Sequence, residues 1–161
     1  MPDMQNDYLF IYGTLRKEIA PSEFIQNLLD RYAEYQDTGF VQAKLYDLGS
    51  YPGLVPSENQ DEQVFGEVYK ILDSRELLEA FDEYEGCSPH FPEPWEFVRK
   101  KMKATLHKGG VVDACIYVYN HDVKDKEQIV SGNYLEYTFV RLPKSSKFLL
   151  RDVSQENGQM C

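Results

Sequence analysis

One carboxylate in this chain lies where an ionised side chain is unfavourable. The sequence SRELLEAFDEYE, residues 74–85, has the periodicity of an amphipathic helix. Its apolar stripe consists of Leu77, Leu78, Phe81 and Tyr84. Glu85 follows Phe81 by four residues and therefore falls inside the stripe, whereas Glu83 falls on the solvent side. Partial burial and the negative end of the helix dipole both raise the pKa of a carboxyl group, so Glu85 is a candidate general acid/base at neutral pH.

The ends of this helix are also marked in the sequence. Asp73 followed by Glu76 resembles a capping box, and Gly86 is the residue type that commonly follows the end of a helix. Glu85 is therefore predicted to be the last helical residue. A Glu at that place can also turn into solvent as the helix end frays, and the pattern alone leaves both interpretations open.

A second candidate for chemistry is the segment Tyr12, Gly13, Thr14 and Leu15. It continues YLFIY, residues 8–12, a short apolar run that predicts a strand buried on both faces. Gly13 permits a sharp turn, so the following backbone amides can converge on an anion, and the Thr14 hydroxyl adds a donor. An ordinary strand-to-loop turn is the alternative. The segment lacks the Gly-Lys-Ser/Thr ending of a nucleotide phosphate loop, so that function is not predicted.

The remaining chemistry-bearing side chains give weaker signals. His90, His107 and His121 show none of the spacings of a zinc site, so no metal is predicted. Cys87 lies three residues before His90 in the segment CSPHFPEP, but a nucleophile pair also needs an orienting third residue, which the sequence does not show. Arg99 is interpreted either as the partner of a carboxylate or as a solvated surface charge.

The elements that must position these residues are predicted from periodicity and turn residues. Strands are predicted at residues 8–12, from Gly39 onward, and at 63–72, 96–106 and 111–119. Helices are predicted from Ser22 onward and at 74–85, with a further helical turn within 125–137. Turns are predicted at residues 51–53 and 108–110, and the acidic segment 57–62 is expected to lack order. Strands and helices do not alternate regularly, so the predicted fold class is α+β.

Composition and charge exclude several classes of protein. The chain has 161 residues, with 17 Lys or Arg and 27 Asp or Glu, which gives a formal net charge of −10. This acidity argues against nucleic acid and anionic membrane surfaces as partners, because both are bound through Lys and Arg. No apolar run reaches the length of a signal-peptide core or a membrane span.

Length and cysteine usage complete this outline. Cys87, Cys115 and Cys161 do not form a disulfide framework, and together with the missing targeting signal they predict a cytoplasmic protein. The length predicts a single domain over residues 1–161, with peripheral or disordered ends at about 1–6 and 154–161. The sequence assigns no oligomeric state.

Several segments, in order along the chain, resemble the γ-glutamylcyclotransferase-like family, and in particular its γ-glutamylamine cyclotransferase branch. They are FIYGTL (residues 10–15), LYDLGSYPGL (45–54), VFGEVY (64–69), FDEYEGC (81–87) and CIYVY (115–119). The resemblance covers residues 8–120 and implies a small mixed β-barrel with flanking helices. It also implies that Tyr12, Gly13, Thr14 and Leu15 bind the α-carboxylate end of a γ-glutamyl group. Glu85, directly before Gly at the helix end, takes the place of the catalytic residue.

The reaction that this resemblance implies is an intramolecular aminolysis of a small-molecule γ-glutamyl amine or amide. Glu85 accepts a proton from the α-ammonium, the freed amine attacks the γ-carbonyl, and Glu85 returns a proton to the leaving amine as 5-oxoproline departs. No metal or organic cofactor is implied. A non-catalytic module of the same fold that binds a carboxylate-bearing metabolite is the alternative, and a scaffold that uses the barrel surface is a third class.

The chain also departs from the family's pattern around the expected pocket. After Leu15 it reads RKEIAPSEF, where the branch usually continues with a basic pair and Gly and then Asn-His. The loop 87–95 is longer than the family's, and its Trp95 is a candidate for shaping the leaving-group side. Phe97 stands where a Tyr is common. The departing amine is therefore the part of the substrate that the resemblance leaves undefined.

Overall fold

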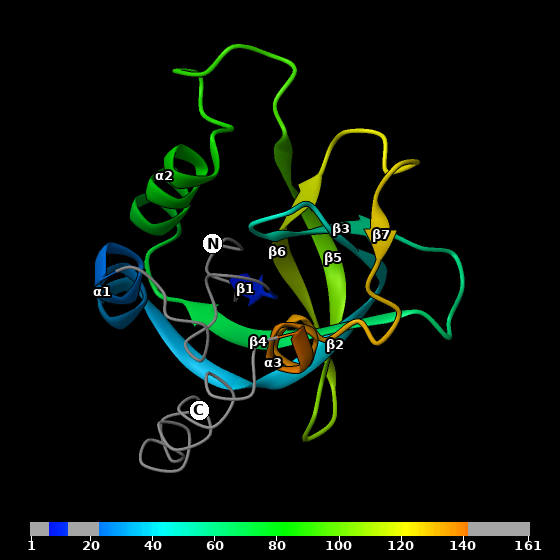
Figure 1. The fold of residues 1–161 in the computed structure, drawn as a ribbon. Coiled ribbons are helices and arrows are strands. Elements are labelled where there is room, and N and C mark those ends of the chain that lie inside the picture. The colour runs from blue at the N-terminus through cyan, green and yellow to red at the C-terminus, as the bar shows by residue number, and fades with distance from the viewer. Residues whose placement is uncertain (1–6, 13–22, 142–161) are drawn as a thin grey trace.

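The structure is a computed structural model that describes residues 7–12 and 23–141. The elements within them are, in order, β1 (Asp7–Ile11), α1 (Glu23–Tyr32), β2 (Ala33–Asp47), β3 (Pro52–Pro56), β4 (Gln63–Ile71), α2 (Ser74–Glu85), β5 (Phe97–Leu106), β6 (Val111–Tyr119), β7 (Glu127–Gln128) and α3 (Tyr134–Arg141). Figure 1 shows the strands wrapped into a barrel with α1 and α2 together on one side.

The strands form a closed ring in the order β2-β4-β1-β6-β5, and the pairing of β5 with β2 closes it. Strands β1 and β6 run parallel, whereas the other neighbours in the ring are antiparallel. Strands β3 and β7 pair with the C-terminal part of β2, outside the ring. The predicted α+β class and the small mixed β-barrel with flanking helices are confirmed.

Closure of the barrel depends on a close approach at Gly39 in β2. This residue pairs with Gly66 of β4 on one side and with Leu106 of β5 on the other. A Cβ atom at Gly39 would collide with the backbone carbonyl oxygen of Thr105. Glycine at this position therefore lets β5 reach the second edge of β2.

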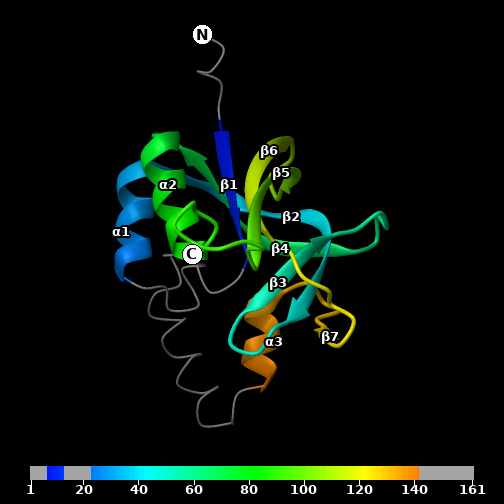
Figure 2. The same ribbon diagram turned by 90° about the horizontal axis from the view of Figure 1, so that it is seen from above.

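Strand β1 separates two hydrophobic clusters, which explains why its sequence is apolar on both faces. Leu9 and Ile11 belong to the cluster that packs beneath α1 and α2, together with Phe81. Phe10 and Tyr12 belong to the cluster inside the barrel. Figure 2 shows α1 and α2 side by side on one side of β1, with α3 apart from them near β3 and β7.

Most elements lie where the sequence predicts them. Helix α2 and strand β6 have the predicted bounds, β4 and β5 differ from theirs by one residue at one end, and β1 differs by one residue at each end. The hairpin turn at residues 108–110 is confirmed. The helical turn predicted within 125–137 is present, because α3 begins at Tyr134, and the helix extends beyond that range to Arg141. The expected ends, residues 1–6 and 154–161, lie outside the described residues.

Three predictions around β2 and β3 were wrong. Strand β2 begins at Ala33, directly after α1, because residues 33–38 pair with β4 despite their polar composition. The turn lies at residues 48–51, and Pro52 instead opens the edge strand β3. The segment 57–62 is an ordered turn: the Ser57 and Asn59 side chains accept hydrogen bonds from backbone amides two residues on, as turn-forming residues do.

None of the helices in the described ranges 7–12 and 23–141 has the length and apolar character needed to span a bilayer.

Candidate active site

Helix α2 carries Glu85 to the rim of the barrel, and both of its ends are fixed by local contacts. At the start, Asp73 accepts a 3.2 Å hydrogen bond from the Glu76 amide. At the end, Gly86 adopts a left-handed conformation with φ 76°, and the Cys87 amide donates to the Asp82 carbonyl. This cap ends the helix after Glu85.

The predicted apolar stripe of α2 is largely confirmed. Leu77 and Phe81 are fully buried against the barrel, whereas Tyr84 is 48% exposed. Glu83 is exposed, as predicted, and holds the following loop through Ser88 and His90. Glu85 lies one turn beyond Phe81 and is half-buried, because the stripe runs into a pocket there instead of continuing into the core.

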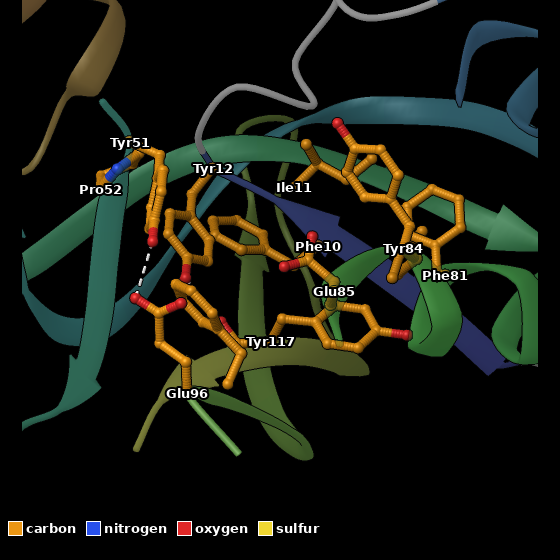
Figure 3. Close-up of a pocket in the computed structure, with 12 residues that line it drawn as sticks. Phe10, Ile11, Tyr12, Tyr51, Pro52, Phe81, Tyr84, Glu85, Glu96 and Tyr117 are labelled. Carbon is orange, nitrogen blue, oxygen red and sulfur yellow. Dashed lines mark hydrogen bonds between the residues drawn. The ribbon is translucent and has the colours of Figure 1, made fainter. Parts of the chain in front are cut away.

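A pocket of about 300 Å³ opens at the C-terminal ends of β1 and α2 and the start of β5. Its lining is mostly aromatic, with two carboxylates: Leu9, Phe10, Ile11, Tyr12, Tyr51, Pro52, Phe81, Tyr84, Glu85, Glu96, Phe97 and Tyr117. Figure 3 shows Glu85 on one side of this pocket and the hydrogen-bonded pair of Tyr51 and Glu96 on the other. Its size falls near the lower end of the range for small-molecule sites, roughly 300–1,000 Å³.

The environment of Glu85 favours its protonated form. Burial of the carboxyl group is the largest cause, and the charges of Glu96 and Asp82 add to it, so the pKa of Glu85 rises from 4.5 to about 7. The position at the C-terminus of α2 acts in the same direction. A carboxyl group with this pKa is suited to both accepting and donating a proton near neutral pH.

Tyr12 lines the same pocket, but its hydroxyl group is bound to the barrel. The hydroxyl donates a 2.6 Å hydrogen bond to the Tyr117 carbonyl and accepts a hydrogen bond from the Leu54 amide. Burial, followed by the charge of Glu85, raises the pKa of Tyr12. Tyr12 therefore contributes an aromatic wall and joins β1 to β6, while its proton is already engaged. Gly13, Thr14 and Leu15, the rest of the predicted binding segment, lie outside the described residues.

Glu96 is a pocket residue that the sequence analysis missed. It directly precedes β5, so the loop between α2 and β5 has Glu85 at one end and Glu96 at the other. Its carboxylate accepts a 2.8 Å hydrogen bond from the Tyr51 hydroxyl. In the sequence, Glu96 is only a charged residue between Trp95 and Phe97 at the start of a predicted strand. This pattern does not indicate that the Glu96 side chain faces a pocket.

Asp82, on the helix that carries Glu85, is the partner of Arg99. Its Oδ1 lies 3.3 Å from the Arg99 Nε, and the two side chains are 20% and 35% exposed. The Tyr117 hydroxyl donates to the same oxygen at 2.6 Å. Of the two interpretations of Arg99, pairing with a carboxylate is the one realised, and that carboxylate belongs to Asp82.

Cys87 and His90 do not form a nucleophile pair. The His90 Nδ1 lies 2.9 Å from the Glu83 carboxylate, whereas the Cys87 thiol points to Asp82. Burial raises the pKa of Cys87 to about 11, which keeps the thiol protonated and unreactive. Among residues 7–12 and 23–141, no group of three or more His, Cys, Asp or Glu side chains is arranged to hold a metal ion.

Comparison with known proteins identifies the family. The family model described as "Gamma-glutamyl cyclotransferase, AIG2-like" matches residues 9–136. The chain belongs to this family. It is 32% identical over 130 residues to the γ-glutamylcyclotransferase family protein YtfP of Citrobacter rodentium, a match that covers 80% of this chain and 95% of that protein.

Solved structures share the fold of this γ-glutamylcyclotransferase-like chain. YkqA from Bacillus subtilis superimposes with a TM-score of 0.61 at 22% identity, over 84% of this chain and 42% of that one, so this chain spans less than half of YkqA. An AIG2-like protein from Mus musculus superimposes with a TM-score of 0.53 at 19% identity, over 81% of this chain and 95% of that one. At these identities the likeness is one of fold.

Proposed function

We propose that this protein converts γ-glutamyl amines or amides into 5-oxoproline and a free amine, with Glu85 as the acid/base. The observation that carries the proposal is the Glu85 carboxyl group in an aromatic pocket with a pKa of about 7. At neutral pH such a group is populated in both protonation states, so one residue can take a proton from one nitrogen and give it to another.

The reaction requires little else from the protein, because nucleophile and electrophile belong to one molecule. Ionised Glu85 takes a proton from the substrate's α-ammonium, and the free amine attacks the γ-carbonyl carbon. A new C–N bond closes the five-membered ring as the original amide C–N bond breaks. The α-nitrogen loses two protons in becoming the lactam N–H, and the departing nitrogen gains two in leaving as an ammonium ion, so neither water nor net protons are consumed.

The aromatic walls have a role in selecting this outcome. Attack by water on the same γ-carbonyl would yield glutamate in place of 5-oxoproline. Phe10, Phe81 and Tyr12 are buried side chains beside Glu85, and they limit the water that can approach the reacting carbon. Binding of the α-carboxylate by Gly13, Thr14 and Leu15 remains the prediction made from the family resemblance.

The test is 5-oxoproline release from a panel of γ-glutamyl amines and dipeptides, with wild type beside Glu85→Gln. The substitution keeps the shape of the side chain and removes the titrating group, so kcat/KM is expected to fall by about a hundredfold or more. Calorimetry is expected to show that the variant still binds the substrate. Glu79→Gln is the matched control, because Glu79 lies on the same helix but on its exposed face, paired only with Arg75 among the described residues.

Two results would count against the proposal. Release that persists in Glu85→Gln at the wild-type rate would remove Glu85 from the mechanism. No release from any substrate by wild type, with γ-glutamyl compounds bound equally by both proteins, would favour the non-catalytic binding module of the same fold.

A further inference from the structure

The pocket contains two carboxylates, although the proposed reaction uses only one. Glu96 lies across the pocket from Glu85 (Figure 3) and is half-buried. Its backbone is fixed by a 2.7 Å hydrogen bond from the Asn120 amide to the Glu96 carbonyl, and its side chain by Tyr51. A carboxylate held at both backbone and side chain is positioned to recognise a ligand without losing much conformational freedom.

Tyr51 is the hydrogen-bond donor of this pair. The hydrogen bond to Glu96 is the main cause that raises the pKa of Tyr51 to about 12, so the phenol stays protonated and donates to the carboxylate throughout the physiological range. The donor occupies Oε2 of Glu96. A carboxylate has two oxygens with about four acceptor sites, so further sites remain for a ligand donor.

Aromatic side chains lie beside this carboxylate, because Tyr51 donates to it and Phe97 follows it in the chain and lines the same pocket. The centroids of the Tyr51 and Phe97 rings lie 6.0 Å apart. A carboxylate beside aromatic faces is the environment that binds an ammonium group, through charge-assisted hydrogen bonds and cation–π attraction. No Lys, Arg or His is among the described residues that line the pocket, so a carboxylate on the departing group would meet repulsion here.

We propose that Glu96, positioned by Tyr51, selects substrates whose departing amine carries a second positive charge. This inference rests on the proposed cyclotransferase function and names its substrate class: γ-glutamyl derivatives of short diamines. The pocket volume of about 300 Å³ limits the departing group to a short chain. Glu85 and Glu96 line the same pocket, so one small molecule can contact both.

The test compares three substrates of matched length: the mono-γ-glutamyl amides of 1,4-diaminobutane, n-pentylamine and 4-aminobutanoate. These present a cationic, a neutral and an anionic end. Wild type is expected to favour the cationic over the neutral substrate by about tenfold in kcat/KM, with the anionic one poorest. Glu96→Gln is expected to bring the three substrates within about threefold of one another, and Tyr51→Phe to weaken the preference partly.

The ratio of kcat/KM between two substrates measures specificity separately from the rate of the chemical step. Glu96→Gln also lowers the pKa of Glu85, but that effect is common to all three substrates and cancels in the ratio. Glu93→Gln is the matched control, because Glu93 lies in the same loop, is exposed and does not line the pocket; its ratios are expected to equal those of wild type.

Failure of this inference is distinguishable from failure of the proposed function. Release of 5-oxoproline with equal kcat/KM for the three substrates, or with a preference that survives Glu96→Gln, would overturn the role of Glu96 and leave the cyclotransferase activity standing. If no substrate is turned over, calorimetric affinities of the same three compounds decide: a cationic preference that Glu96→Gln abolishes supports the recognition role, and equal affinities overturn it.

Discussion

The hydroxyl group of Tyr117 in β6 donates a 2.6 Å hydrogen bond to Oδ1 of Asp82 in α2. Arg99 in β5 approaches the same oxygen, so two barrel strands hold one carboxylate of the helix. Glu85 follows Asp82 by three residues, slightly less than one helical turn. These contacts therefore fix the last turn of α2 against the barrel, and with it the position of Glu85 in the pocket.

Removing the Tyr117 hydroxyl is expected to loosen this attachment. In Tyr117→Phe the buried ring remains, but Asp82 loses a hydrogen bond to a charged acceptor, which costs about 1.5–3 kcal/mol of unfolding free energy. We expect kcat to fall more than KM rises, because Glu85 is less well placed. Urea unfolding and steady-state kinetics measure both effects.

Tyr119→Phe is the control for this experiment. Tyr119 lies two residues further along β6, and within residues 7–12 and 23–141 its hydroxyl makes no hydrogen bond. An equal loss of stability in the two variants would show that the Tyr117–Asp82 contact contributes nothing of its own.

The rate of 5-oxoproline release is expected to fall below neutral pH. Glu85 must be ionised to accept a proton, and its pKa is about 7, so kcat/KM falls tenfold per pH unit on the acid side. The charge of Glu96 contributes to this pKa, so Glu96→Gln is expected to move the acid limb to lower pH. A profile that is flat between about pH 5 and pH 8, or an acid limb unchanged in Glu96→Gln, would contradict this assignment.

Stability is expected to change with pH in the opposite direction to activity. The pKa of Glu85 is about 7 in the folded protein against 4.5 ordinarily, so the folded state binds this proton more tightly than the unfolded state does. The contribution of Glu85 to stability therefore declines as pH rises from about 4.5 to about 7 and is level above that. Glu85→Gln does not titrate, so it is expected to be more stable than wild type at pH 8 and closest to wild type below pH 4.5.

Urea unfolding of both proteins across this range measures the difference. Glu79→Gln serves as the reference, since Glu79 is exposed and its replacement should leave the pH dependence as in wild type. A constant difference between Glu85→Gln and wild type from pH 4.5 to pH 8 would mean that Glu85 is not desolvated in the folded protein.

Helix α2 was predictable from sequence because every determinant of it is local. The cap at Asp73, the stripe through Phe81 and the stop at Gly86 lie within fourteen consecutive residues, and the position of Glu85 on the stripe follows from helical geometry alone. The sequence of β1 likewise predicted burial on both faces, because its residues are apolar throughout and do not alternate with polar ones. In the structure a hydrophobic cluster lies on each side of the strand.

The second half of the pocket was not predictable in this way. Tyr51 meets Glu96 across 45 residues of sequence, and Tyr12 bonds to Tyr117 across 105. The second contact follows from the parallel pairing of β1 with β6, and the first brings the turn between β2 and β3 beside the residue that precedes β5. No short pattern encodes either arrangement. The role of Asp82 was missed for the same reason, since its partners lie on β5 and β6.

Closure of the barrel can be tested at Gly39. In Gly39→Ala the new Cβ meets the backbone carbonyl oxygen of Thr105, which belongs to the paired strand β5 and cannot turn aside as a side chain would. We expect a loss of about 1–3 kcal/mol in the unfolding free energy. The sign is informative, because Gly→Ala at an unconstrained site stabilises a protein by about 0.4–1 kcal/mol through the unfolded state.

Thr38→Ala is the neighbouring control, since Thr38 is exposed and the substitution keeps the backbone carbonyl that accepts a hydrogen bond from the His107 amide. It is expected to unfold at nearly the wild-type urea concentration, while Gly39→Ala unfolds earlier and shows a weaker 5-oxoproline activity because β5 carries Phe97 to the pocket. Gly39→Ala with wild-type or higher stability would mean that β2 and β5 do not approach as closely as the register of Gly39 with Leu106 requires.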